Sequence, residues 1–261
     1  MNKNRAFLIL SGVILMFSAT YIFACNSSHF NVSEIKARGN DKVSSDEIME
    51  KAKSCVGANI FSLDLKRIEK RLRQDKRIND VVVKRRLPGC ILVEVEEKLP
   101  VLWISLPANH NGSRSYGFCG LSIDQEIIPL EKKDLHHDLP LVSGIEMGKP
   151  SPGQAPQPYR KWSDVKAEKA LEFYRTVTAI DPSSVRLLSE INLKDMSNTT
   201  VYLIPGIRVM MGHGSFEKKW RRLRAILGRE DKIEELVSVD LRFDDQVVLS
   251  RSSKTSSSPA D

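Results

Sequence analysis

The residues best suited to covalent chemistry are two Ser-x-x-Lys tetrads, "SDVK" at Ser163 and "SFEK" at Ser215. In acyl-serine enzymes such a serine is the nucleophile and the lysine helps to activate it. Those enzymes also carry Ser-Asp-Asn and Lys-Thr-Gly motifs, and neither accompanies the tetrads here. Both serines precede a helical pattern, where a serine hydroxyl accepts a backbone N–H as an N-cap. The sequence therefore predicts two helix caps and no enzyme.

Metal and redox chemistry have equally little support. The pair His136-His137 has no third ligand at useful spacing, so we expect a solvated loop and no metal or cofactor. None of the four cysteines forms a CxxC pair, and we expect buried thiols. A disulfide stays open, because a sequence does not give the connectivity among four cysteines; the four are Cys25, Cys55, Cys90 and Cys119.

Composition indicates a globular chain with room for one large or two small domains. Of its 261 residues 41% are hydrophobic, and 40 basic residues against 33 acidic ones give a net charge of +7. That charge permits an anionic partner but does not require one, because acids are interspersed with the bases.

The N-terminal segment predicts a membrane anchor. Residues 6–24 carry no charge, and at about 1.5 Å per residue they are just long enough for a bilayer core of about 30 Å. Lys3 and Arg5 precede this run, whereas no Lys or Arg follows closely. The positive-inside rule therefore places the tail 1–5 in the cytoplasm and everything from Cys25 onward outside.

Two other interpretations of this segment stay open. It is long for the apolar region of a cleaved signal peptide, which usually spans about 7–15 residues. Alternatively, "IFAC" places a small residue directly before Cys25, as in a lipoprotein signal, although Phe23 is bulky for that cleavage box.

The next residues predict the order β-α-α-β-β. "HFNVSEIKARGN" alternates as a half-buried strand. A helix capped by Ser44 follows in "VSSDEIMEKAKS". The helix in "FSLDLKRIEKRLRQD" has the apolar stripe Leu65, Ile68 and Leu72.

Two antiparallel strands around a Leu-Pro-Gly turn complete this unit in "RINDVVVKRRLPGCILVEVEEKLPV". We expect Val81 and Val83 to face the core, and Leu92 to face solvent with the neighbouring glutamates. Basic residues of the first strand then meet acidic residues of the second, which stabilises a sheet by about 0.2–1 kcal/mol per pair. A nucleic-acid surface would leave its basic residues uncompensated and add stacking aromatics, so we exclude it.

This order after one membrane anchor is that of a POTRA domain, and the residues resemble the FtsQ/DivIB family of bacterial cell-division proteins. The resemblance rests on several short features in the same order and spacing. They are the Gly39-Asn40 turn, the run Asn59 to Asp64, Arg85 three residues before Pro88, and Glu97 three residues before Pro100.

The resemblance implies an α+β fold with a transmembrane helix at 6–24, a POTRA domain at 30–98 and an FtsQ-type β domain at 99–251. In the β domain we expect a polar loop at 106–115, a hairpin around Asp124-Gln125 and a proline-rich loop at 144–162. Two helices follow, which Ser163 and Ser215 would cap. Lys219 is expected on the solvent-exposed face of the second helix. Residues 252–261 are predicted to be a disordered tail.

As a member of this family, the chain would be a non-enzymatic, single-pass scaffold of the division septum. It would link early and late division proteins by binding FtsB-like and FtsL-like partners, and its POTRA domain would dock other division or secretion proteins. The alternatives are a POTRA-containing envelope lipoprotein and a secretion accessory protein. A POTRA module feeding an outer-membrane barrel would need many more strands than this chain has.

The resemblance places the FtsB contact on the last strand of the β domain. A final strand followed by a polar tail is expected at a sheet edge, where free N–H and C=O groups accept another strand. The predicted binding residues are Phe243, Gln246, Val247, Val248, Leu249, Ser250 and Arg251.

We predict that residues 1–24 stay attached in the mature protein, because the apolar run is long enough to span a bilayer. Mass spectrometry of protein purified from membranes checks this. A mature N-terminus at Cys25, lipidated or not, would contradict it.

Overall fold

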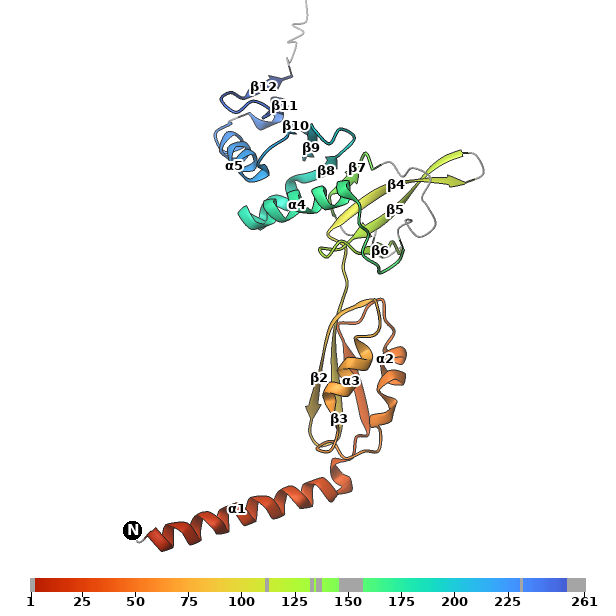
Figure 1. The fold of residues 1–261 in the computed structure, drawn as a ribbon, viewed down its shortest axis with the longest axis vertical. Helices are drawn as coiled ribbons and strands as arrows, with labels where there is room; N and C mark the ends of the chain where they lie inside the picture. Colours follow the sequence, from red (N-terminus) through yellow and green to blue (C-terminus); the bar gives the residue numbers. More distant parts are fainter. Residues whose placement is uncertain are drawn as a thin grey trace, which may run out of the picture. The chain divides into compact units, whose positions relative to one another are not determined.

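The computed structural model describes residues 3–110, 113–131, 134, 138–145, 157–230 and 232–252. The chain divides into two compact units, Met1–Lys98 and Leu99–Asp261, which are considered separately (Figure 1). Together they confirm the predicted α+β class with an N-terminal apolar helix. His136-His137, most of the proline-rich loop and the tail beyond residue 252 lie outside the described residues.

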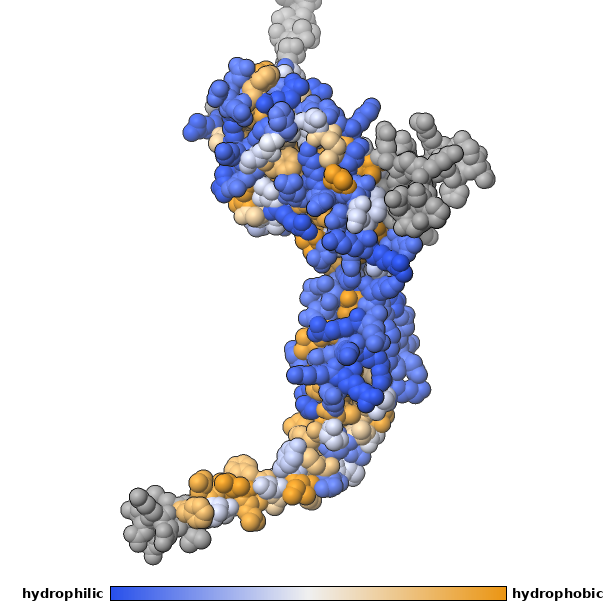
Figure 2. Space-filling model, in the orientation of Figure 1, coloured by the Kyte–Doolittle hydropathy of each residue, from blue (hydrophilic) through white to orange (hydrophobic). Residues whose placement is uncertain are grey.

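Helix α1, Lys3–Asn26, contains the predicted apolar run. By length and composition it can cross a membrane, and none of its window Ile9–Asn26 is buried against the rest of the chain. Apolar side chains make up much of its coloured surface (Figure 2). The first unit therefore begins with a helix whose apolar side chains are not covered by the rest of the chain, as suits a helix that lies in a bilayer.

After α1, the first unit contains a three-stranded sheet covered by the helices α2 and α3. The strand order β1-β3-β2 puts β3 at the centre, parallel to β1 and antiparallel to β2. Its core joins the helices to the inner face of the sheet. The elements are η1 Ser28–Phe30, β1 Glu34–Arg38, α2 Ser45–Ala52, η2 Lys53–Cys55, α3 Leu65–Leu72, β2 Ile78–Arg86 and β3 Cys90–Glu97.

Leu92 departs from its predicted exposure. Its side chain points away from the core, yet it is only 3% exposed. Because β3 is central, Leu92 lies directly between Lys36 of β1 and Lys84 of β2, whose aliphatic stems can cover it. The ammonium group of Lys84 pairs with Glu94, which confirms the expected pairing of opposite charges on this face.

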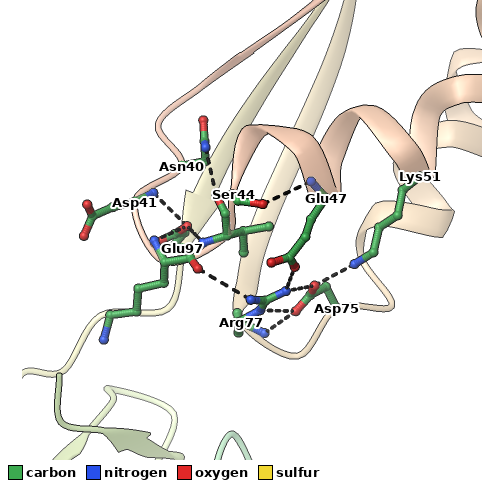
Figure 3. A network of polar contacts seen from close by, with 10 residues as sticks. Asn40, Asp41, Ser44, Glu47, Lys51, Asp75, Arg77 and Glu97 are labelled. Carbon is green, nitrogen blue, oxygen red and sulfur yellow. Dashed lines mark hydrogen bonds and ion pairs between the residues drawn. The ribbon is translucent and has the colours of Figure 1, made fainter.

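The carboxylate of Glu97 holds the end of β3 to the loop before α2 (Figure 3). Three consecutive backbone N–H groups donate to it, those of Asp41 at 2.9 Å, Lys42 at 2.8 Å and Val43 at 2.8 Å. The chain enters this loop at Gly39, which has a φ of +77°. A Cβ at this position would lie 2.3 Å from the Val95 carbonyl oxygen, so only glycine fits. The loop is thereby fixed just before Ser44 caps α2.

A second polar cluster connects the two helices (Figure 3). Asp75, just after α3, accepts from Arg77 Nη2 at 2.8 Å and from Lys51 Nζ of α2 at 2.6 Å. Arg77 also pairs with Glu47 of α2. The hydrogen bonds from Arg77 hold the pKa of Asp75 well below its usual range.

The second unit is one mixed nine-stranded sheet in the order β12-β11-β10-β9-β8-β7-β4-β5-β6. Two parallel pairs, β7 with β8 and β10 with β11, are each joined through a helix, as parallel neighbours require a crossover. The elements are β4 Leu102–His110, β5 Ser113–Leu121, β6 Ile127–Pro129, β7 Leu141–Ser143, α4 Val165–Ile180, η4 Pro182–Leu187, β8 Leu188–Asn192, β9 Thr199–Leu203, β10 Ile207–Gly212, α5 Phe216–Leu227, η5 Ile233–Glu235, β11 Leu236–Asp240 and β12 Val248–Arg251.

Helices α4 and α5 pack on each other through aromatic rings. Phe173 contacts Phe216 and Trp220 edge-to-face, with ring centroids 5.2 Å and 5.6 Å apart. All three side chains are buried and belong to the core between the helices and the sheet. Such pairs contribute about 0.5–1.5 kcal/mol beyond the burial of their area.

Three predictions for this unit are corrected. The polar segment 106–115 is not a loop over its whole length, because β4 and β5 continue into it as a long hairpin. Helix α4 is capped by Asp164 rather than Ser163, since the Asp164 carboxylate accepts the N–H groups of Lys166 and Ala167 at 2.9 Å. The last strand begins at Val248, so Gln246 and Val247 precede it.

We expect Leu72→Ala to destabilise the first unit by about 2–5 kcal/mol, because it leaves a cavity at a fully buried site. Hydrogen exchange of backbone amides in residues 30–98 measures the loss. All three tryptophans, Trp103, Trp162 and Trp220, belong to the second unit, so their fluorescence unfolding curve is an internal control. Unchanged exchange would show that α3 is not packed as described.

Asp75→Asn should remove about 1–3 kcal/mol from the first unit at pH 7, because it weakens hydrogen bonds to two cations. A carboxylate with a lowered pKa stabilises the fold above its unfolded pKa of about 3.9, and this contribution is lost as the pH falls further. The difference between wild type and variant should therefore be constant from neutral pH down to about pH 5 and shrink below about pH 4. Hydrogen exchange at several pH values tests this; a difference that does not depend on pH would contradict it.

Candidate partner-binding site

The predicted binding strand β12 lies at one end of the nine-stranded sheet. It pairs on one side with β11, in an antiparallel register that places Val248 opposite Asp240 and Leu249 opposite Val239. Within the part of the chain that the structure describes, no strand pairs with its other side. The structure thus presents β12 as an edge strand of four residues.

The backbone groups that face the open side of β12 can be identified. The N–H of Ser252 donates to the Glu235 carbonyl at 2.8 Å, toward the β11 side. In an antiparallel ladder the two sides alternate from one residue to the next. Val248 and Ser250 therefore bond toward β11, whereas Leu249 and Arg251 direct their N–H and C=O groups outward.

Apolar side chains accompany this backbone edge. Val247 and Leu249 are half-buried against the core, which fixes the strand to the domain. Val248 is 49% exposed and Phe243, in the preceding loop, is 45% exposed. Val237 of β11 is also exposed, because the bulge between Leu236 and Ser238 adds a residue there. The sequence did not indicate Val237, since a bulge leaves no clear pattern in "LVSVD".

Charged side chains hold the loop between β11 and β12 in place. Arg222 of α5 donates through Nη1 to the carbonyls of Phe243 at 3.0 Å and Asp244 at 2.8 Å. Arg242 pairs with Asp240 at 2.7 Å, and its hydrogen bonds lower the pKa of that carboxyl. The Arg242 guanidinium lies 6.0 Å from the centre of the Phe243 ring. Phe243 is thus exposed on a loop that is fixed on both sides.

A basic hollow of about 430 Å³ opens beside Phe243. Lys218, Lys219, Arg222 and Arg242 line it, with Asp244 as the acidic residue among its lining. Of these, only Arg242 and Asp244 lie next to the predicted site in the sequence. The α5 residues were not assigned to it, because their approach depends on the fold.

The prediction that Lys219 lies on the solvent-exposed face of α5 is wrong. Lys219 is only 9% exposed, and its ammonium group donates to the carbonyls of Met211 at 2.5 Å and His213 at 2.6 Å. Burial lowers its pKa, and the carboxylates of Asp244 and Asp240 oppose that shift. Lys219 therefore satisfies carbonyls at the end of β10.

Side chains of both Ser-x-x-Lys tetrads form hydrogen bonds with the backbone of the domain. Ser215 caps α5 as predicted, since its hydroxyl accepts the Lys218 N–H at 3.4 Å. Lys166 of the other tetrad donates to the Gly144 carbonyl at 2.5 Å. Among the described residues, no group of three or more His, Cys, Asp or Glu side chains could hold a metal ion.

The residues that carried the family resemblance also have internal roles. Arg85 donates to the carbonyls of Ile60 at 2.7 Å and Leu63 at 2.6 Å. Asn59 donates to the carbonyl of Ala24, in the last turn of α1, at 2.9 Å. Arg85 and Glu97 thus hold loops to the sheet, and Asn59 holds the loop before α3 to the end of α1.

Comparison with known proteins agrees with this architecture. The family described as "POTRA domain, FtsQ-type" matches residues 30–98, and "Cell division protein FtsQ/DivIB, C-terminal" matches residues 121–242. The second match ends just before Phe243, so the edge strand lies beyond it.

Similar proteins come from several bacteria. The cell division protein FtsQ of Syntrophotalea carbinolica is 27% identical over 82% of this chain and 70% of its own length. FtsQ of Myxococcus fulvus is 26% identical over 83% of this chain and 72% of its own. DivIB of Bacillus cytotoxicus is 24% identical over 84% of this chain and 77% of its own. With both domain families matched in order after an apolar helix, the chain belongs to the FtsQ/DivIB family of bacterial cell-division proteins.

Proposed function

We propose that this protein is a membrane-anchored scaffold of the division septum that binds an FtsB-like partner by accepting its strand at β12. In this proposal α1 holds the N-terminus in the cytoplasm and both domains outside. FtsL-like protein joins through the same assembly, and no chemistry is performed on any of the partners.

The observation that carries this proposal is the outward-facing backbone of Leu249 and Arg251. An extended segment of a partner can bond to both residues and continue the sheet by one strand. The exposed side chains of Val248 and Phe243 offer apolar contact area near such a strand. The fixed loop lowers the entropy that ordering this surface would cost on binding.

The basic hollow adds a requirement on the partner. Four cationic side chains line it together with the carboxylate of Asp244, and one of the four, Arg242, is paired with Asp240. A partner whose strand is preceded or followed by acidic residues would complement this charge, which favours encounter and fixes the direction of binding. We therefore expect the affinity to fall with rising salt.

Arg251→Pro and Arg251→Ala form a matched test of strand addition. Both variants lose the ion pair with Glu230, at 2.9 Å, but only proline removes the outward N–H. We expect the proline variant to bind the purified extracytoplasmic part of the FtsB-like partner about tenfold more weakly than the alanine variant, a difference of about 1.4 kcal/mol. Surface plasmon resonance on the full chain in nanodiscs measures both.

Phe243→Ala should weaken the same binding without altering the ladder, because it removes an exposed aromatic anchor. Circular dichroism and tryptophan fluorescence confirm that each variant is folded. If all three folded variants bind the partner with wild-type affinity, the partner does not use β12.

A further inference from the structure

The end of the first unit that adjoins α1 has a surface that the proposed partner contact does not use. It consists of the loop 59–63, the start of α3 at 64–67 and the hairpin tip 84–89, and we call it the α1-proximal surface. The tip connects β2 to β3. The carboxylate of Glu97 and its hydrogen bonds lie at the other end of these strands. A strand as long as β2 separates the two ends by about 3.4 Å per residue.

Hydrogen bonds attach this surface closely to the last turn of α1. Asn59 Nδ2 donates to the carbonyls of Ala24 at 2.9 Å and Ser27 at 3.3 Å. The next carbonyl along, that of Ile60, accepts from Arg85 at 2.7 Å. Two side chains thus connect the helix end to the hairpin.

The hairpin tip is also held to the segment that leaves α1. The carbonyl of Gly89 accepts the N–H of Ser33 at 2.9 Å. At Gly89 a Cβ would lie 2.4 Å from the Asn31 carbonyl, so only glycine permits this approach. Since Asn31 follows α1 by a few residues, the tip stays near the point where α1 ends.

The exposed side chains of the α1-proximal surface are basic and apolar. Leu87 at the tip is 60% exposed. Arg86 beside it and Lys66 and Arg67 of α3 are exposed, and no described residue pairs with their side chains. Asp64 is the carboxylate at this point, and it caps α3 by accepting the Arg67 N–H at 3.3 Å. The surface therefore has an excess of positive charge around one apolar side chain.

We propose that the α1-proximal surface docks on anionic phospholipid headgroups of the bilayer that α1 crosses, with Leu87 inserted at the boundary between headgroups and acyl chains. This inference rests on the membrane anchor of the proposed function, but not on partner binding at β12. The apolar run of α1 ends at Ala24 and polar residues follow it, so the groups bonded to that turn lie at the level of the headgroups. Basic side chains are attracted to an anionic surface, and an apolar residue among them adds buried area.

The attachment of the α1-proximal surface to α1 indicates which partner binds it. A bilayer is the one partner that α1 brings permanently within reach of this surface. Apolar side chains run along α1 up to this end of the unit (Figure 2). A soluble acidic protein would instead have to enter the narrow space beside the membrane. Docking would hold the POTRA domain at a defined angle to the membrane.

A tryptophan reporter tests the proposal in the full chain. Leu87→Trp places an indole at the tip, and Leu99→Trp is the matched control, because Leu99 is 58% exposed beyond the opposite end of β3. Both are reconstituted in nanodiscs of brominated lipids, either pure phosphatidylcholine or with one-third phosphatidylglycerol. We expect quenching and a blue shift of Leu87→Trp in the anionic nanodiscs, and neither change for Leu99→Trp.

Charge variants test the role of the headgroups. Arg86→Glu in the Leu87→Trp background should abolish the anionic-lipid quenching, as should high salt. Lys76→Glu, at an exposed position before β2, makes the same change of charge at the other end and should have no effect. In the protein with the natural Leu87, hydrogen exchange of residues 84–89 should slow in anionic nanodiscs. This measurement tests docking without the tryptophan, in case the substitution disturbs the tip.

Equal quenching of the two reporters, or equal quenching in both lipid compositions together with unchanged hydrogen exchange, would overturn the proposal. Partner capture on the same samples distinguishes it from the proposed function. Lipid-dependent quenching with no capture at β12 would contradict only the partner site. A chain that does not co-purify with nanodiscs would contradict the anchor and, with it, this inference.

Discussion

The arrangement of the POTRA domain depends on one buried carboxylate, that of Glu97. The N–H groups of residues 41–43 lie just before a helix, and leaving such groups buried and unsatisfied would cost about 1–3 kcal/mol each. Glu97 accepts all three, so the start of α2 is fixed to the end of the central strand. Asp75 and Arg77 then position α3 against α2 (Figure 3). The two helices are thus placed by polar contacts at one end, and the apolar core fills the space between them and the sheet.

In the β domain, long cationic side chains hold a helix to neighbouring strands and loops. From α5, Lys219 donates to a backbone carbonyl near the end of β10. Arg222 donates to a backbone carbonyl in the loop after β11. An open strand edge is an aggregation hazard, which short length and charged side chains reduce. In β12 both features are present, because the strand has four residues and ends in Arg251. The edge strand at which partner binding is proposed is therefore open on one side and too short to favour nonspecific pairing.

Local patterns predicted most elements, and contacts between distant segments account for the errors. Ser44 and Ser215 were recognised as caps because the signal lies within one helical turn, whereas Ser163 and Asp164 both fit that signal and only the fold chose between them. The exposure of Leu92 depended on which strands flank β3, and that of Lys219 on carbonyls supplied by β10. At the candidate site, alternation identified the strand, but its place in the sheet, the bulge at Val237 and the basic hollow are properties of the assembled domain.

The order of elements in the sheet has a consequence for biogenesis. The strand β12 follows every other described element in the chain, and it pairs with β11, which itself requires the crossover through α5. In the proposed topology, the edge strand would therefore be completed only after the rest of the β domain has left the translocation machinery. A chain truncated before residue 248 would keep the apolar helix α1 but lack β12, so under the proposed function it could not replace a complete copy in the assembly.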